Sequence, residues 1–142
     1  MLSKPKVIKE TSKFQKYNKV TSTETDNTGE KSTDAVSFVE SKYPKTAAEF
    51  KRIQREQYEL FCKKQMDYGP SNISVGTDLS TEADIKLALT GLWFRMSDKI
   101  QRLKNLFMSG QEANNEPLED SFLDVSNYGI MATIVNNKKW GK

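Results

Sequence analysis

The sequence predicts an all-α fold, a bundle of about three main helices with no β-sheet. Two observations predict it. Apolar residues recur at helical spacing through long segments of the chain, and capping residues stand at the expected helix starts. Three helices made of fewer than about 100 residues bury few apolar side chains, so we expect oligomerisation to complete the bundle.

The first 44 residues are predicted to be a disordered arm that precedes an all-α domain at 45–142. They are rich in Lys, Ser, Thr, Asn and Glu, and the tract 21–34 has almost nothing to bury. Residues 1–20 carry six lysines and one acid, Glu10. Any weak contact with nucleic acid is therefore expected in this arm.

The first predicted helix covers about 46–66. Thr46 and Glu49 have the spacing of a capping box, and apolar residues follow at helical intervals. Gly69 and Pro70 end the helix, because glycine adopts the terminating conformation and proline cannot continue the hydrogen-bond ladder. We expect a loop from there to Ser80.

The second predicted helix covers about 82–108 and the third about 116–136. Thr81 caps the second, Gly110 ends it, and Pro117 suits the first turn of the third. Residues 128–135 are apolar on nearly all sides, so we expect self-association, as a dimer or tetramer, to cover them. The basic tail 138–142 is expected to be loose, with Trp140 as the one residue that could dock.

Composition limits the chemistry. The chain has no histidine, which excludes His-based acid–base catalysis and His-ligated zinc. The lone Cys62 is predicted to be a free thiol, as in a reducing cytoplasm. No apolar stretch approaches the roughly 20 residues that span a bilayer, so no membrane association is expected. Carboxylates without histidine suit hard metals, Mg²⁺ or Mn²⁺.

Asp120 and Asp124 are four residues apart and share one helical face, with apolar neighbours. Their mutual repulsion calls for a positive partner, either a divalent cation or an Arg or Lys from another element. On the second helix Arg95, Lys99 and Arg102 share a face; they either pair with Asp98 or contact phosphates. Glu56 and Glu59 on the first helix also allow two interpretations. They either bind a ligand or form ordinary ion pairs with Arg52, Arg55 and Lys63, which are four residues away along the helix.

Three blocks in this order resemble a known family: Asp67-Tyr68-Gly69, then Arg95-x-x-Asp98-Lys99-x-x-Arg102, then Glu116-x-x-x-Asp120-x-x-x-Asp124-x-x-x-Tyr128. Over about residues 46–137 the chain looks like the phage-encoded nucleotide modification associated domain, type one. That family is in turn similar to the all-α nucleoside triphosphate pyrophosphohydrolases of the MazG type.

The resemblance implies a Mg²⁺-dependent hydrolysis of a nucleoside triphosphate to monophosphate and pyrophosphate, in the cytoplasm of a phage host. Glu56, Glu59, Asp120 and Asp124 would bind the metal. Glu56 or Glu59 would also orient or deprotonate the attacking water. The MazG pattern has Glu-x-x-Asp where this chain has Asp120-x-x-x-Asp124. Substrate contacts are implied for Arg95, Lys99, Arg102, Tyr68 and Tyr128, the tyrosines by stacking on the base.

Two other hypotheses remain open. The chain could be a non-catalytic helical oligomer that binds nucleotides or nucleic acid and is linked to DNA base modification. It could also be a structural bundle in which the acids and bases pair with one another. Metal dependence separates hydrolysis from both.

Overall fold

The computed structural model describes residues 34–142. The chain divides into two units, 1–34 and 35–142, and the second contains every described residue except Asp34. Its residues form five helices and no strand: α1 (Ala35–Lys42), α2 (Pro44–Tyr68), α3 (Ser71–Ser74), α4 (Glu82–Ser109) and α5 (Leu118–Asn136). The all-α prediction is therefore confirmed, and the three predicted long helices correspond to α2, α4 and α5.

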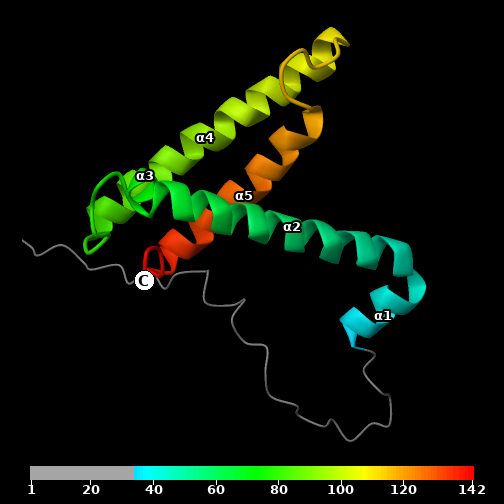
Figure 1. The fold of residues 1–142 in the computed structure, drawn as a ribbon, viewed down its shortest axis with the longest axis horizontal. Coiled ribbons are helices and arrows are strands. Elements are labelled where there is room, and N and C mark those ends of the chain that lie inside the picture. The colour runs from blue at the N-terminus through cyan, green and yellow to red at the C-terminus, as the bar shows by residue number, and fades with distance from the viewer. Residues whose placement is uncertain (1–33) are drawn as a thin grey trace, which may run out of the picture. The chain divides into compact units, whose positions relative to one another are not determined.

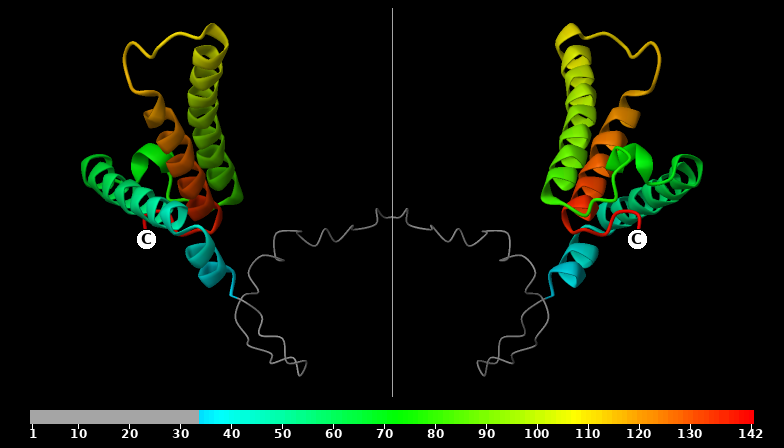
Figure 2. Two further views of the ribbon diagram at one scale, coloured as in Figure 1. Left: turned by 90° about the vertical axis from the view of Figure 1, so that its right-hand side faces the viewer. Right: turned by 90° about the vertical axis from the view of Figure 1, so that its left-hand side faces the viewer.

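Helices α4 and α5 form an antiparallel hairpin, seen side by side in Figures 1 and 2. Thr81 caps α4 as predicted: its hydroxyl accepts from the amide of Asp84, whose carboxylate accepts from the Thr81 amide. Gly110 ends α4 in the left-handed conformation, at φ 62°. The guanidinium of Arg102 donates to the Ser121 hydroxyl and the Glu116 carbonyl, so it fastens the connecting loop to the hairpin.

Helix α2 begins earlier than predicted. Its N-cap is Tyr43, with no side-chain capping bond, and Pro44 occupies the first turn. Proline is pre-set for that position, so the helix starts there and Thr46 falls inside it. The predicted capping box of Thr46 and Glu49 is therefore wrong, and Glu49 instead accepts from Arg52 at 2.6 Å.

Residues 35–42 were predicted to belong to a disordered arm, and this is wrong, because they form α1. Apolar residues of α1 and α2 line a shared hollow, among them Val36, Val39 and Phe50, and Lys51 pairs with Glu40 across the two helices. The short α1 is therefore accompanied by apolar and charged side chains of α2, and its own composition does not indicate this contact. The remainder of the predicted arm, residues 1–33, and its expected nucleic-acid contact lie outside the described residues.

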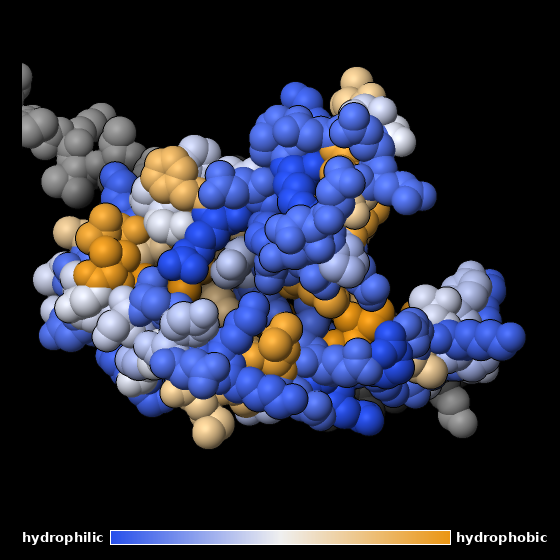
Figure 3. Space-filling model, turned by 45° about the horizontal axis from the view of Figure 1, so that its top comes forward, coloured by the Kyte–Doolittle hydropathy of each residue, from blue (hydrophilic) through white to orange (hydrophobic). Residues whose placement is uncertain are grey.

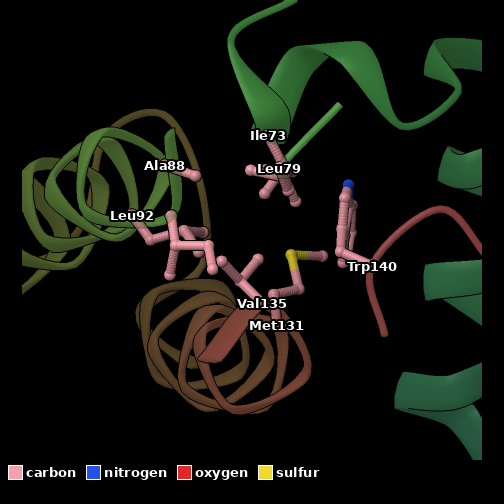
Figure 4. Packing of buried hydrophobic residues seen from close by; sticks show 8 residues of the cluster. Ile73, Leu79, Ala88, Leu92, Met131, Val135 and Trp140 are labelled. Atoms are coloured by element: carbon pink, nitrogen blue, oxygen red, sulfur yellow. The ribbon is translucent and has the colours of Figure 1, made fainter. Parts of the chain in front are cut away.

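The core lies where the start of α4 and the end of α5 meet α3 and the C-terminal segment (Figure 4). Its buried members are Ile73, Leu79, Ile85, Ala88, Leu92, Met131, Val135 and Trp140. The indole N–H of Trp140 donates to the Pro70 carbonyl at 3.0 Å, and its ring meets Phe61 edge-on. The tail predicted to be loose is therefore anchored by Trp140.

The apolar segment 128–135 is largely covered within the chain. Met131 and Val135 are buried, Tyr128, Ala132 and Ile134 are partly buried, and Ile130 is exposed. Apolar side chains are instead exposed elsewhere, and Figure 3 shows several separate hydrophobic groups on one face. In the part of the chain that the structure describes, no helix is long and apolar enough to cross a membrane.

Candidate functional site

A cleft of about 300 Å³ opens where α2, α3, α4 and α5 converge. We call it the basic cleft. It is lined by Phe61, Lys64, Gln65 and Tyr68 of α2, Asn72 and Ile73 of α3, Arg95 of α4, and Asp124, Asn127, Tyr128 and Met131 of α5. Its volume is at the lower end of the range of small-molecule sites.

The helical repeat explains how α2 contributes to this cleft. Phe61, Lys64, Gln65 and Tyr68 are within one or two turns of one another at helical spacing, so they fall on one face of the helix. Gln57, one turn earlier, is buried and donates to the carbonyl oxygen of Leu123 at 3.4 Å. Gln57 therefore faces α5, and the residues that line the cleft lie on the same side of α2.

One carboxylate and three cations set the electrostatics of the cleft. The carboxylate of Asp124 lies 2.7 Å from the ammonium of Lys99 and 3.8 Å from that of Lys64. Arg95 donates to the carbonyl of Asn72 at 3.3 Å. Because Asp124 is held mainly by Lys99, the charges of Lys64 and Arg95 remain available to an anion in the cleft.

The pair of Lys99 and Asp124 is the most enclosed ion pair among the described residues, with side chains 24% and 20% exposed. The hydrogen bond to Asp124 raises the pKa of the Lys99 ammonium, and the charges of Asp124 and Glu116 act in the same direction, against partial burial. Lys99 is therefore firmly protonated near neutral pH.

The remaining lining is aromatic and amide-bearing. Tyr68 and Tyr128 supply ring surface and hydroxyls, and Gln65, Asn72 and Asn127 supply both donors and acceptors. Such groups suit a ligand with a flat ring and a polar edge. A cleft that contains both cations and aromatic rings suits a ligand in which an anionic group is attached to an aromatic ring.

Several predicted site residues are brought together here. Arg95, Tyr68, Tyr128 and Asp124 line the cleft, and Lys99 contacts it through Asp124. Arg102 does not, since it binds the loop before α5. Pairing of Arg95 and Arg102 with Asp98 was one of two alternatives for this helix face, and both arginines instead donate to groups of other elements.

The four predicted metal ligands are not gathered. Glu56 and Glu59 are rotated from the α5-facing Gln57 by about 100° and 160°, and Glu56 pairs with Arg52 at 2.5 Å. Asp124 has lysine partners, which was the alternative weighed for it. Among residues 34–142 no group of three or more His, Cys, Asp or Glu side chains could hold a metal ion. Metal binding stays a prediction.

Among the polar lining residues, sequence reasoning missed Lys64, Gln65, Asn72 and Asn127. Lys64 stands between Phe61 and Tyr68 at helical spacing, and this pattern could have indicated it. Asn127 similarly follows Asp124 by three residues. Asn72 carried no comparable signal, because it lies in a segment predicted to be a loop.

A family model described as nucleotide modification associated domain 1 matches residues 64–135, just over half of the 142 residues. The chain belongs to this family. Comparisons with curated proteins and with solved structures gave no match. The relation to MazG-type pyrophosphohydrolases and a phage origin stay predictions.

The matched part of this nucleotide modification associated domain contains every lining residue of the basic cleft except Phe61. Glu56 and Glu59 lie outside it. The family match thus covers nearly all of the cleft lining but neither Glu56 nor Glu59. The family description also connects the chain with nucleotide metabolism.

Proposed function

We propose that this chain binds a nucleotide in the basic cleft, as part of nucleotide metabolism. The observation that supports this most is the convergence of Lys64 and Arg95 with Tyr68 and Tyr128 in one cleft inside the family-matched segment. Phosphate groups would contact the two cations. The base would stack on a tyrosine ring and use the amides for its polar edge.

The distances suggest how a phosphate would enter. Lys64 holds Asp124 only at 3.8 Å, so an incoming phosphate competes with a weak ion pair there. Lys99 holds Asp124 at 2.7 Å and would keep it in place. Lys64 and Arg95 are therefore the primary phosphate ligands in this proposal, and Lys99 positions Asp124.

Calorimetric titration with a panel of nucleoside and deoxynucleoside triphosphates tests the binding. Lys64→Gln and Arg95→Gln should each weaken it by at least about tenfold, since a charge-assisted hydrogen bond contributes about 1.5–3 kcal/mol. Lys63→Gln is the matched control, because Lys63 is adjacent on α2 but outside the cleft lining. Equal loss in the control, or no binding by the wild type, would contradict the proposal.

Hydrolysis of the bound triphosphate to monophosphate and pyrophosphate with Mg²⁺ is a second proposal. The observation that favours it is that Asp124 lines the cleft and shares a face of α5 with Asp120. Mg²⁺ is commonly held by one or two carboxylates plus substrate phosphate oxygens, which needs no preformed group of acids. Bound in this way it would neutralise phosphate charge. The non-catalytic binding module remains the alternative.

Chromatography of a reaction with Mg²⁺ tests turnover. Asp120→Asn should reduce hydrolysis at least about tenfold while nucleotide binding without metal persists. Glu59→Gln tests whether the glutamates of α2 take part. If Asp120 and Asp124 of α5 are enough to hold Mg²⁺, this variant should leave turnover unchanged. A wild type that binds nucleotides but releases no pyrophosphate would leave the binding module as the function.

A further inference from the structure

A second hollow, of about 260 Å³, lies between α2 and α5 beside the basic cleft. Residues of these two helices line it, and none of them is charged. We call it the uncharged hollow. Phe61, Asn127 and Met131 line both it and the basic cleft, so the two spaces adjoin along these three side chains.

The two spaces differ in the chemistry of their linings. The basic cleft contains the charges of Lys64, Arg95 and Asp124. The uncharged hollow has aromatic and aliphatic side chains together with neutral amides. A nucleotide is divided in the same way, into anionic phosphates and a flat, uncharged base. A charge is costly to bury without a partner, whereas an aromatic ring gains from burial, so the phosphates favour the cleft and the base favours the hollow.

The size of the basic cleft also favours an extended ligand. Its 300 Å³ lie at the lower end of the range for small-molecule sites. Phosphates that contact Lys64 and Arg95 would leave little of this volume for the base. The uncharged hollow nearly doubles the space, and it begins where Phe61 and Asn127 end the cleft.

Tyr58 offers a stacking surface in the uncharged hollow. Its ring is 66% exposed and lies nearly parallel to that of Phe61, with centroids 6.4 Å apart and planes 23° apart. Tyr128, in contrast, packs against the hydrophobic core. A base can stack on an accessible aromatic ring whatever its identity, because every base has a π-face. The amide of Asn127 at the junction can both donate to and accept from the edge of a base.

We infer that the uncharged hollow is the base subsite of this chain. The inference rests on the proposed binding of a nucleotide in the basic cleft. Lys64 and Arg95 hold the phosphates, the ligand passes Asn127, and the base stacks on Tyr58. The ligand class is therefore a nucleotide recognised through its base as well as its phosphates, and not an inorganic polyphosphate.

Calorimetric titration of the full chain with dATP, dCTP, dGTP and dTTP, each compared with inorganic triphosphate, tests the inference. Inorganic triphosphate has the phosphates but no base, so it should bind the wild type more weakly than the best of the four nucleotides. Tyr58→Ala should weaken nucleotide binding about tenfold, as expected for the loss of one stacked base, and leave binding of inorganic triphosphate unchanged. Tyr58→Phe keeps the ring and should bind nucleotides as the wild type does.

Tyr68→Ala is the matched comparison for the ring. Tyr68 is also a tyrosine of α2 and is 65% exposed, but it lines the basic cleft and not the uncharged hollow. Its replacement should weaken nucleotide binding less than Tyr58→Ala does. Loss of binding in Tyr68→Ala with none in Tyr58→Ala would place the base in the cleft and overturn the inference, while nucleotide binding itself would stand.

Filling the uncharged hollow is an independent test. Ile130 lines it and is 51% exposed, so Ile130→Trp should obstruct the hollow, keep the helical circular dichroism and weaken nucleotide binding alone. Thr133→Trp is the control, because Thr133 is exposed on α5 outside both linings. Equal affinities in these two variants would overturn the inference, as would a wild type that binds inorganic triphosphate as tightly as every nucleotide. A wild type that binds neither kind of ligand would overturn the proposed function as well.

Discussion

Asp124 shows how the partners of one residue decide its role. In the sequence it stands four residues from Asp120, and like charges at that spacing repel. In the fold its carboxylate accepts from Lys99 at 2.7 Å, with Lys64 at 3.8 Å. The repulsion expected along α5 is therefore offset by cations from α4 and α2, and Asp124 contributes to stability.

Replacing Lys99 with Met should lower the free energy of unfolding by about 1–3 kcal/mol, because Asp124 then loses its closest partner in a partly enclosed site. Urea unfolding at neutral pH measures this. Lys138→Met is the control: its pair with Glu82 is as short, at 2.8 Å, but both side chains are well exposed, so the loss should stay below about 1 kcal/mol. Equal losses would show that enclosure does not matter here.

The same pair predicts a pH dependence. The pKa of Lys99 is raised above its ordinary value of 10.5 by the bond to Asp124. A raised pKa stabilises the fold fully below the unfolded-state value and loses that effect as pH rises through the folded-state value. The stability gap between wild type and Lys99→Met should therefore be constant near neutral pH and shrink above pH 10.5. A gap that persists there would contradict the ion pair.

At the scale of helices, two similar capping patterns had different outcomes. Thr81 and Asp84 form the reciprocal cap of α4, whereas Thr46 and Glu49 form none. The difference lies in what precedes them. Pro44 starts α2 two residues before Thr46, and Arg52 takes the Glu49 carboxylate at 2.6 Å. Residues with the spacing of a capping box therefore form no cap when a proline just before them starts the helix earlier.

The C-terminal segment behaves as part of the helical unit. Trp140 is buried against Phe61 and bonded to the Pro70 carbonyl, so it joins α2, α3 and the end of α5. Trp140→Ala should lower the free energy of unfolding by about 3–5 kcal/mol, the usual cost of removing a buried aromatic side chain. Thermal and urea unfolding measure this. Met66→Ala, at an exposed position of α2, should have little effect; a tolerant Trp140→Ala would mean the tail is not anchored.

At the scale of the whole described unit, the α4/α5 hairpin has two distinct faces. One faces α2 and α3 and carries Arg95 and Asp124 of the basic cleft. The other leaves the apolar side chains of Trp93, Ile100 and Phe122 about half exposed.

The sequence by itself determined the three long helices, the caps at Thr81 and Gly110, and the family. The helices and caps depend on local signals, since helical periodicity and terminating residues act within a few positions. The sequence also pointed to Arg95, Tyr68, Tyr128 and Asp124, because their blocks carry the family resemblance.

Only the tertiary structure decided what those residues meet. Helix α1 lies against α2, with which it lines a hollow, and Trp140 packs on Phe61 of α2 and donates to the Pro70 carbonyl. Helix α2 turns Gln57 toward the Leu123 carbonyl of α5, and in this orientation Lys64 lines the cleft and Glu56 does not. Periodicity specifies which residues share a helix face, but packing between residues far apart in sequence chooses the face that each helix buries.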